Sequence, residues 1–147
     1  MGLGSSPSDI HSFLDALLNE DDVALKEAAE RIGPELAIAA ISLLLSILVA
    51  ARFGSDPEID VLSQYAKAAS VQSDRHPRQM ILEAVLRAGS GDDGILTGFS
   101  EDEILETTPI LLSCMYQDLA DDFIGRAKLV ERAARFTAAR CRPDTKN

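Results

Sequence analysis

Acidic side chains are the residues of this chain whose types and spacing could most directly do chemistry. Asp118 and Asp122 stand four positions apart, so on a single helix both carboxylates would share one face. Two carboxylates on one face can hold a hard cation through oxygen ligands, or exchange protons with a substrate. Such sites usually take their ligands from several elements, and this pair alone does not indicate a reaction. We therefore assign no catalytic, metal-binding or cofactor-binding residue and expect no cofactor.

The histidines and cysteines give no stronger signal. His11 and His76 are the two histidines, and neither belongs to a recognisable nucleophile arrangement. Cys114 lies in the apolar run 110–115, where a small buried hydrophobe is expected. The two cysteines lack C-x-x-C spacing, and we expect no secretory leader, a combination typical of reduced thiols in an intracellular protein. We expect a cytoplasmic location.

Basic side chains gather at the end of the chain, where residues 124 to 147 contain seven basic and two acidic residues. Projection of a helix over this segment, at about 100° per residue, places a group of cations opposite an apolar face. The predicted cationic strip consists of Lys128, Arg132, Arg135 and Arg142. Such a strip could bind an acidic protein, an anionic membrane or RNA, or it could be a solvated face that offsets the acidic body.

The charge of the remaining chain narrows the choice of partner. Residues 1 to 123 contain 7 basic and 22 acidic residues, and the whole chain has a formal net charge of −10. A body this acidic repels the phosphate backbone, so nucleic acid is not an expected partner. A membrane is not expected either. The expected partner is another protein or a second copy of this chain, forming a homo-oligomer.

The elements that must position these residues are organised by one apolar helix, predicted over residues 34–53. Leu36 to Ala51 is a run of sixteen residues without a formal charge, bracketed by Glu35 and Arg52. A helix that is apolar all round must be enclosed by protein or lipid. A membrane span needs about 20 apolar residues, and this run is shorter. The sequence therefore favours the buried core helix of a soluble protein.

One side of this helix consists of small residues, which leaves a second interpretation open. The stripe is formed by Ala39, Ser42, Ser46 and Ala50. Small side chains let another helix backbone approach closely, so the helix could also be shared across an oligomer interface. A membrane span is the third and least favoured interpretation on length.

The other segments repeat one pattern of a cap, an apolar stripe at helical spacing, and then glycine or proline. Helices are predicted from Pro7, from Asp21 to Gly33, from Ser55-Asp56-Pro57-Glu58, and from Pro77 to Gly89. Ile59 and Met80 are among the residues expected to face inward. No segment shows sustained alternation of apolar and polar residues, so strands are not predicted.

The strongest local signal is the start of a helix at Ser100. Ser100 and Glu103 match a capping box, with Phe99 and Ile104 at the two staple positions. Pro109 follows, and an interior proline loses a hydrogen bond and clashes with the preceding turn. We therefore predict a short helix to about Glu106, a new start at Thr108–Pro109, and a final helix pair extending to about Arg140.

Together these patterns predict an all-α fold: a compact single-domain bundle of seven or eight helices around a buried apolar central helix over residues 34–53. The domain is expected to span residues 7–142, with flexible tails at 1–6 and 143–147. Since no segment indicates a reaction, the expected function is that of an intracellular acidic protein–protein interaction module, such as an adaptor, regulator, inhibitor or immunity-type protein. The alternative is a small helical enzyme or ligand-binding bundle with a cavity near the Asp118–Asp122 carboxylates.

Overall fold

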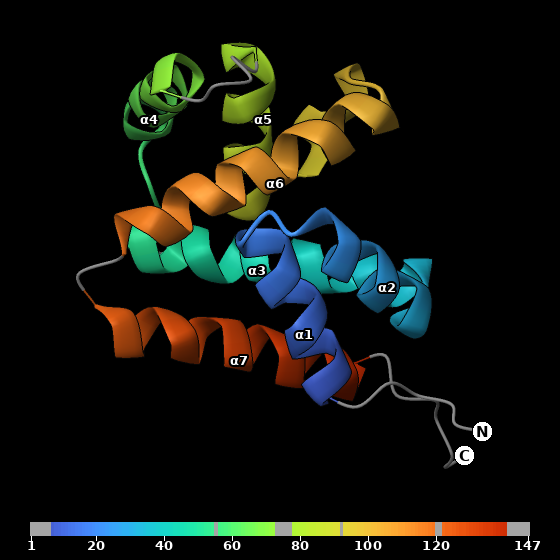
Figure 1. Cartoon of the computed structure of the whole chain (residues 1–147). Helices are drawn as coiled ribbons and strands as arrows, with labels where there is room; N and C mark the ends of the chain where they lie inside the picture. The colour runs from blue at the N-terminus through green and yellow to red at the C-terminus, as the bar shows by residue number, and fades with distance from the viewer. Residues whose placement is uncertain (1–6, 55, 73–77, 92, 120–121, 141–147) are drawn as a thin grey trace. The chain divides into compact units, whose positions relative to one another are not determined.

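The structure, a computed structural model, describes residues 7–54, 56–72, 78–91, 93–119 and 122–140. Every regular element within these ranges is helical, which confirms the all-α class and the predicted number of helices (Figure 1). The elements are α1 (Pro7–Leu18), α2 (Asp22–Ile32), α3 (Pro34–Phe53), α4 (Ile59–Gln72), α5 (Gln79–Gly89), the 3-10 helix η1 (Asp93–Gly98), α6 (Glu101–Asp118) and α7 (Phe123–Arg140).

The chain divides into two units, each with its own internal packing, and we describe them separately. Unit 1 comprises Met1–Leu44 and Asp121–Asn147, and unit 2 comprises Leu45–Ala120. The first part of α3 therefore belongs to unit 1 and the rest to unit 2. The expectation of a single domain over residues 7–142 stays a prediction, and the tails predicted at 1–6 and 143–147 lie outside the described residues.

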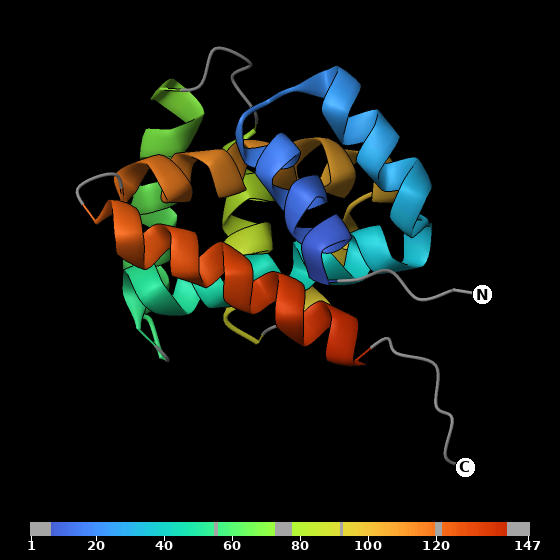
Figure 2. The same cartoon turned by 60° about the horizontal axis from the view of Figure 1, so that its bottom comes forward.

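Unit 1 is built around α1, which packs against both α2 and α7 (Figure 2). The predicted apolar stripe of α1 is buried as a whole, at Ile10, Phe13, Leu14, Leu17 and Leu18. An exposed ion pair between Arg31 Nε and Asp9 Oδ1, at 3.6 Å, also joins α2 to α1. An exposed pair of this kind contributes little to stability, so apolar burial, including the stripe of α1, is the main source of cohesion in the unit.

The bounds of α2 follow from local chemistry at both ends. Asp21 caps the start, where its Oδ1 accepts a hydrogen bond from the backbone N–H of Ala24 at 3.2 Å. Gly33 ends the helix with a φ of 90°, a conformation that side chains other than glycine rarely adopt. Its N–H donates to the carbonyl of Ala29 at 2.8 Å. Both ends agree with the sequence prediction.

Unit 2 is organised around α5, which packs against α4, η1 and α6. A close approach to the end of α3 occurs at Gly89, where an added Cβ would lie 2.9 Å from Val49 Cγ2 and 3.0 Å from Leu45 Cγ. Contacts this short would force the two side chains to move, so glycine is what allows α5 and this part of α3 to pack closely.

Two residues predicted to face inward in unit 2 are exposed instead. Ile59 is 55% exposed and Met80 is 70% exposed. Each lies in the first turn of its helix, where side chains tilt toward the N-terminal end and extend past the neighbouring helices. The prediction for these two side chains is therefore wrong. The proposed start of α5 at Pro77 lies outside the described residues, and the helix itself begins at Gln79.

The predicted apolar helix is present as α3, at the predicted bounds, and its burial differs around its axis. The buried residues are Ala40, Leu44, Leu45, Leu48 and Val49. The exposed ones include Ser42, Ser46 and Ala50, which belong to the stripe of small residues. Ile38 is also 53% exposed. The branched side chains of α3 thus supply core contacts, while much of the small-residue stripe is open.

By length and composition α3 could also cross a membrane. Of its 18-residue apolar window, 33% is buried within the protein. The core helix of a soluble protein and a signal sequence near the N-terminus satisfy the same criteria. A single helix of this kind is therefore weak evidence for a membrane span.

The helix break predicted at Pro109 is wrong. Helix α6 runs without interruption from Glu101 to Asp118, with Pro109 in its interior. Buried residues lie on both sides of the proline, including Thr108, Leu111 and Leu112. The Thr108 hydroxyl also donates to the carbonyl of Ile104 at 2.7 Å, one turn earlier. Burial around and after the proline, from Thr107 to Met115, therefore outweighs the cost of about 3 kcal/mol for an interior proline.

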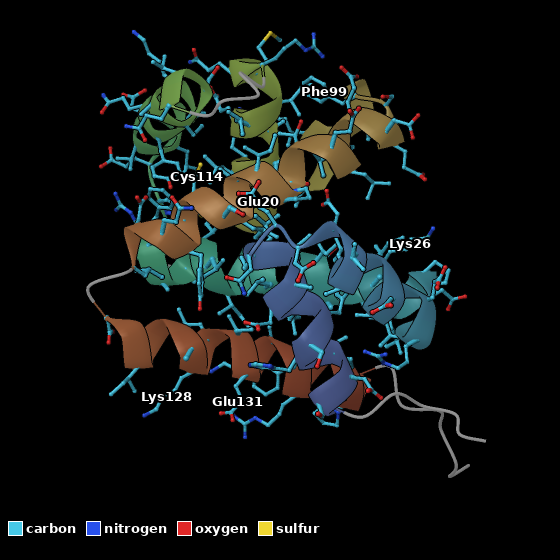
Figure 3. All side chains as sticks on the ribbon, viewed as in Figure 1. Glu20, Lys26, Phe99, Cys114, Lys128 and Glu131 are labelled. Atoms are coloured by element: carbon cyan, nitrogen blue, oxygen red, sulfur yellow. The ribbon has the colours of Figure 1, made fainter. Side chains whose placement is uncertain are left out.

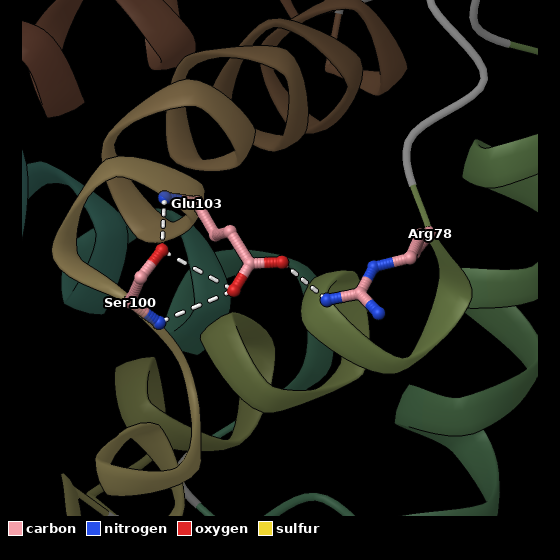
Figure 4. A network of polar contacts seen from close by, with 3 residues as sticks. All are labelled: Arg78, Ser100 and Glu103. Atoms are coloured by element: carbon pink, nitrogen blue, oxygen red, sulfur yellow. Dashed lines mark hydrogen bonds and ion pairs between the residues drawn. The ribbon is translucent and has the colours of Figure 1, made fainter.

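The start of α6 confirms the predicted capping box (Figure 4). The Ser100 hydroxyl oxygen accepts a hydrogen bond from the Glu103 backbone N–H at 3.1 Å. The Ser100 backbone N–H donates to Glu103 Oε1 at 3.2 Å. Arg78, which precedes α5, forms an ion pair with the other carboxylate oxygen of Glu103. Glu103 therefore connects the start of α6 to the start of α5, both in unit 2.

The same contacts favour the charged form of Glu103. The hydrogen bond from the Ser100 backbone lowers the pKa of this carboxyl below its ordinary value, and the nearby Arg78 charge lowers the pKa further. The carboxylate therefore stays ionised at neutral pH and remains an acceptor for the cap.

We expect Ser100→Ala to lower the free energy of unfolding by about 0.5–2 kcal/mol, because the variant removes the acceptor for the Glu103 N–H. Urea denaturation followed by circular dichroism measures the change. Ser12→Ala, at an exposed position inside α1, is the control, and its expected change is within about 0.5 kcal/mol. Equal midpoints for wild type and Ser100→Ala would contradict the role of the cap.

Candidate functional site

The cationic strip predicted from the sequence lies on α7, and Asp122 defines where this helix begins. Asp122 Oδ1 accepts a hydrogen bond from the backbone N–H of Gly125 at 3.0 Å. An added Cβ at Gly125 would lie 2.0 Å from Asp122 Oδ2, so glycine leaves room for the carboxylate over the first turn. Asp122 is thus an N-cap, the position at which aspartate is strongly preferred.

The sequence argument that paired Asp118 with Asp122 is wrong. Asp118 is the last residue of α6, whereas Asp122 precedes α7 and belongs to the other unit. Leu119, after the end of α6, already departs from helical geometry, with φ −97° and ψ 15°. Because the chain leaves the helix between them, the two carboxylates do not occupy neighbouring turns of one helix. The proposed carboxylate face therefore does not exist.

The two faces of α7 agree with the projection from the sequence. The buried side contains Val130, Ala133, Ala134 and Thr137. The Thr137 hydroxyl is satisfied locally by donating to the carbonyl of Ala133 at 2.7 Å. Lys128, Arg132 and Arg135 are all exposed, and Lys128 projects outward from the helix (Figure 3). The fourth residue predicted for the strip, Arg142, lies outside the described residues.

The exposed cations of α7 are not neutralised by the part of the chain that the structure describes. Its four ion pairs involve Arg31, Arg52, Arg78 and Arg87, and none involves Lys128, Arg132 or Arg135. Glu131 is exposed on the same helix (Figure 3) and does not pair with them. The three charges are thus presented to solvent, where they can meet an external anion.

Two large apolar side chains accompany the strip, and the sequence reasoning missed both. Ile124 is 69% exposed and Phe136 is 50% exposed. With Lys128 and Arg132 they form a row at i, i+4, i+8 and i+12 along α7. This spacing was available in the sequence, but an apolar residue at the boundary of a helical projection does not reveal whether it is covered.

A second polar cluster, in unit 2, joins the end of α3 to α4 and α6. The Tyr65 hydroxyl donates to Asp118 Oδ2 at 2.6 Å. Arg52 Nε lies 3.6 Å from the same oxygen. The Arg52 guanidinium also lies 5.1 Å from the ring centroid of Phe53 and 5.5 Å from that of Tyr65. The two rings meet edge to face at 5.1 Å. Asp118 is therefore engaged by two neighbours.

The contacts between Tyr65, Asp118 and Arg52 stabilise the fold and do not indicate catalysis. Burial raises the pKa of the Tyr65 phenol well above its ordinary value, and the hydrogen bond to the Asp118 carboxylate raises the pKa further. The phenol therefore stays protonated and continues to act as a donor. A tyrosine that serves as a general base or nucleophile needs the opposite shift. We therefore regard Asp118 as a partner of Tyr65 and Arg52 within the fold.

The other residues considered for catalysis or metal binding do not form a cluster within the described part of the chain. Among the residues that the structure describes, no group of three or more His, Cys, Asp or Glu side chains could hold a metal ion. Cys114 is half-buried in α6, less enclosed than the sequence predicted. His11 is half-buried in α1, and His76 lies outside the described residues. The cationic strip on α7 is therefore the best-defined candidate site.

Comparisons with protein-family models, with curated proteins and with solved structures found no match to this chain.

Proposed function

We propose that the protein is an intracellular protein–protein interaction module that binds an acidic surface of another protein through α7. The observation that carries the proposal is the exposure of Lys128, Arg132 and Arg135 on one side of α7, without a carboxylate partner among the described residues. The opposite side of the helix is buried in unit 1. The backbone that carries the cations is therefore already ordered, and the entropic cost of association falls on their side chains alone.

The chain's own charge supports a protein partner over nucleic acid. The formal net charge is −10, so a long polyanion would meet repulsion beyond its immediate contacts with the strip. A compact acidic patch would need to reach only the strip itself. Exposed charges are screened over about 8–10 Å at physiological ionic strength, so local attraction can operate despite the acidic body.

The enzyme or ligand-binding alternative, a cavity near the Asp118–Asp122 carboxylates, stays a prediction. The two residues lie at the ends of different helices rather than on one helix face. Asp118 is also occupied by Tyr65 and Arg52.

We expect the double variant Lys128→Glu/Arg132→Glu to keep the helical fold and to lose the protein's specific partner, because both side chains are exposed and their reversal turns attraction into repulsion. Capture of cellular proteins on immobilised wild type and variant, quantified by mass spectrometry at about 0.15 M salt, measures the loss. Circular dichroism and a urea midpoint verify the fold.

The matched control is Lys26→Glu/Lys67→Glu, which produces the same change in net charge at exposed sites on α2 and α4. This control should retain the partner. Equal retention of every captured protein by both double variants would overturn the proposal. Labelled RNA or duplex DNA that bound wild type at low-micromolar concentration, and lost binding only with the α7 variant, would place nucleic-acid recognition first.

A further inference from the structure

The row Ile124, Lys128, Arg132 and Phe136 is a continuous ridge of exposed side chains on α7, with apolar residues at its ends and cations between them. Residues four apart are neighbours along an inclined row that winds about 40° around the helix per step, and such rows form the ridges that pack into the grooves of a second helix. Twelve residues of helix span roughly 18 Å, so the two apolar ends are separated by about three turns. Arg135 lies beside this ridge and adds a third charge.

From this order of side chains we propose that the partner surface recognised by α7 is an acidic amphipathic helix. The inference rests on the proposed function and specifies the partner: two carboxylates face Lys128 and Arg132, and an apolar side chain at each end contacts Ile124 or Phe136. The apolar–charged–charged–apolar order is symmetric, so a parallel or an antiparallel partner can match it. Because the ridge is inclined to the axis of α7, a partner helix that follows it crosses α7 at an angle and must be about three turns long to reach both ends.

The two kinds of residue have different roles in this recognition. Exposed charges mainly steer association and reject wrong partners, and they contribute modestly to affinity. Truncation of an aromatic or other anchor inside an interface typically costs more than the loss of a charge at its rim. Phe136, half-exposed and one turn after Arg132, is the residue best placed to act as such an anchor. A purely acidic segment without apolar residues should therefore bind more weakly than an amphipathic one.

An anionic membrane is another candidate that could bind the same surface, and the ridge fits a membrane less well. Membrane-surface helices place their apolar residues along one continuous face and their cations along the other. On α7 the cations separate the two apolar residues, and Glu131 is exposed on the same helix. An anionic bilayer would have to accommodate that carboxylate close to Lys128.

The test uses a synthetic helical peptide of about 20 residues with Leu, Glu, Glu and Leu at i, i+4, i+8 and i+12 in an Ala/Gln background. Two control peptides replace both Leu residues with Ser, or exchange the positions of Leu and Glu. Fluorescence anisotropy at about 0.15 M salt measures binding to the full chain. We expect the matched peptide to bind about tenfold more tightly than either control, the equivalent of about 1.4 kcal/mol.

The protein variants identify the surface that binds the peptide. Ile124→Ala/Phe136→Ala should weaken binding of the matched peptide about tenfold and leave binding of the Leu→Ser peptide unchanged. Val71→Ala/Met80→Ala, which truncates two side chains each 70% exposed on α4 and α5, should change neither. Lys128→Glu/Arg132→Glu should abolish binding of both peptides.

The outcomes separate this inference from the proposed function. Equal binding of all three peptides, each lost on charge reversal, would overturn the amphipathic helix and leave a charge-only protein partner. Peptide binding that survived charge reversal would overturn both proposals. No binding of the matched peptide at about 1 mM would overturn the inference. Co-sedimentation with vesicles containing anionic phospholipid, lost in Ile124→Ala/Phe136→Ala, would assign the ridge to a membrane surface instead.

Discussion

Leu44→Asp is expected to abolish the cooperative unfolding transition of the protein. Leu44 is fully buried on α3, at 0% exposure. A carboxylate placed there would enter the apolar core, where no buried cation among the described residues could pair with it. An unpaired charge in the interior costs several kcal/mol, against a total stability of about 5–15 kcal/mol for a folded domain. Urea titration followed by circular dichroism should give a gradual signal change without a defined midpoint.

The matched control for this prediction is Ser46→Asp, two residues further along the same helix. Ser46 is exposed, so the new carboxylate stays hydrated and the transition should remain cooperative. Ile47→Asp should fall between the two because Ile47 is half-buried. If Leu44→Asp unfolded at the wild-type midpoint, the buried side of α3 would be wrongly assigned.

Leu112→Ala in α6 is expected to lower the free energy of unfolding by about 2–5 kcal/mol, because it removes a fully buried side chain and leaves a cavity. Leu112 is 0% exposed and lies less than one turn after Pro109. Its packing is part of what keeps α6 helical through the proline. Urea midpoints at an unchanged slope measure the loss.

Leu105→Ala removes the same group from the same face of α6, two turns before Leu112 and one turn before the proline. Leu105 is 44% exposed, so nearly half of its surface already contacts water in the folded protein and its truncation leaves no closed cavity. The expected loss is within about 1 kcal/mol. Equal losses for the two leucines would contradict the difference in burial between the first turns of α6 and the part after the proline.

Features that depend on one turn of helix could be predicted from the sequence. The caps at Asp21 and Ser100 require only a side-chain oxygen three residues before a backbone N–H, and both are present. Gly33 ends α2 because its φ of 90° suits glycine. These signals act through neighbours in the chain, so no knowledge of the fold is needed to interpret them.

Features that depend on packing could be predicted only in part. The penalty at Pro109 is local and visible in the sequence, whereas the burial that outweighs it depends on which helices pack against α6. The same limit explains Ile59 and Met80, which have inward helical spacing but no covering neighbour at the ends of their helices. Periodicity identifies the apolar face of a helix, but it does not show how much of that face neighbouring helices bury.

The candidate site also has one part that the sequence predicts and another that depends on packing. The exposure of Lys128, Arg132 and Arg135 was predicted from the periodicity of one helix. The contact between Tyr65 and Asp118 joins residues 53 positions apart, and no pattern in a single sequence pairs them. The interpretation of Asp118 as half of a carboxylate face failed for this reason, since its partners come from α3 and α4.

The Tyr65–Asp118 hydrogen bond also gives the protein an intrinsic optical signal. The chain has two tyrosines and no tryptophan, so its near-ultraviolet emission comes from tyrosine alone. A carboxylate that accepts a hydrogen bond from a phenol quenches the emission of that phenol, because the excited ring readily transfers its proton. We therefore expect the emission of Tyr65 to be weak while its hydrogen bond to Asp118 holds and to rise when the bond breaks. The opening of this part of unit 2 can thus be followed by fluorescence without any added label.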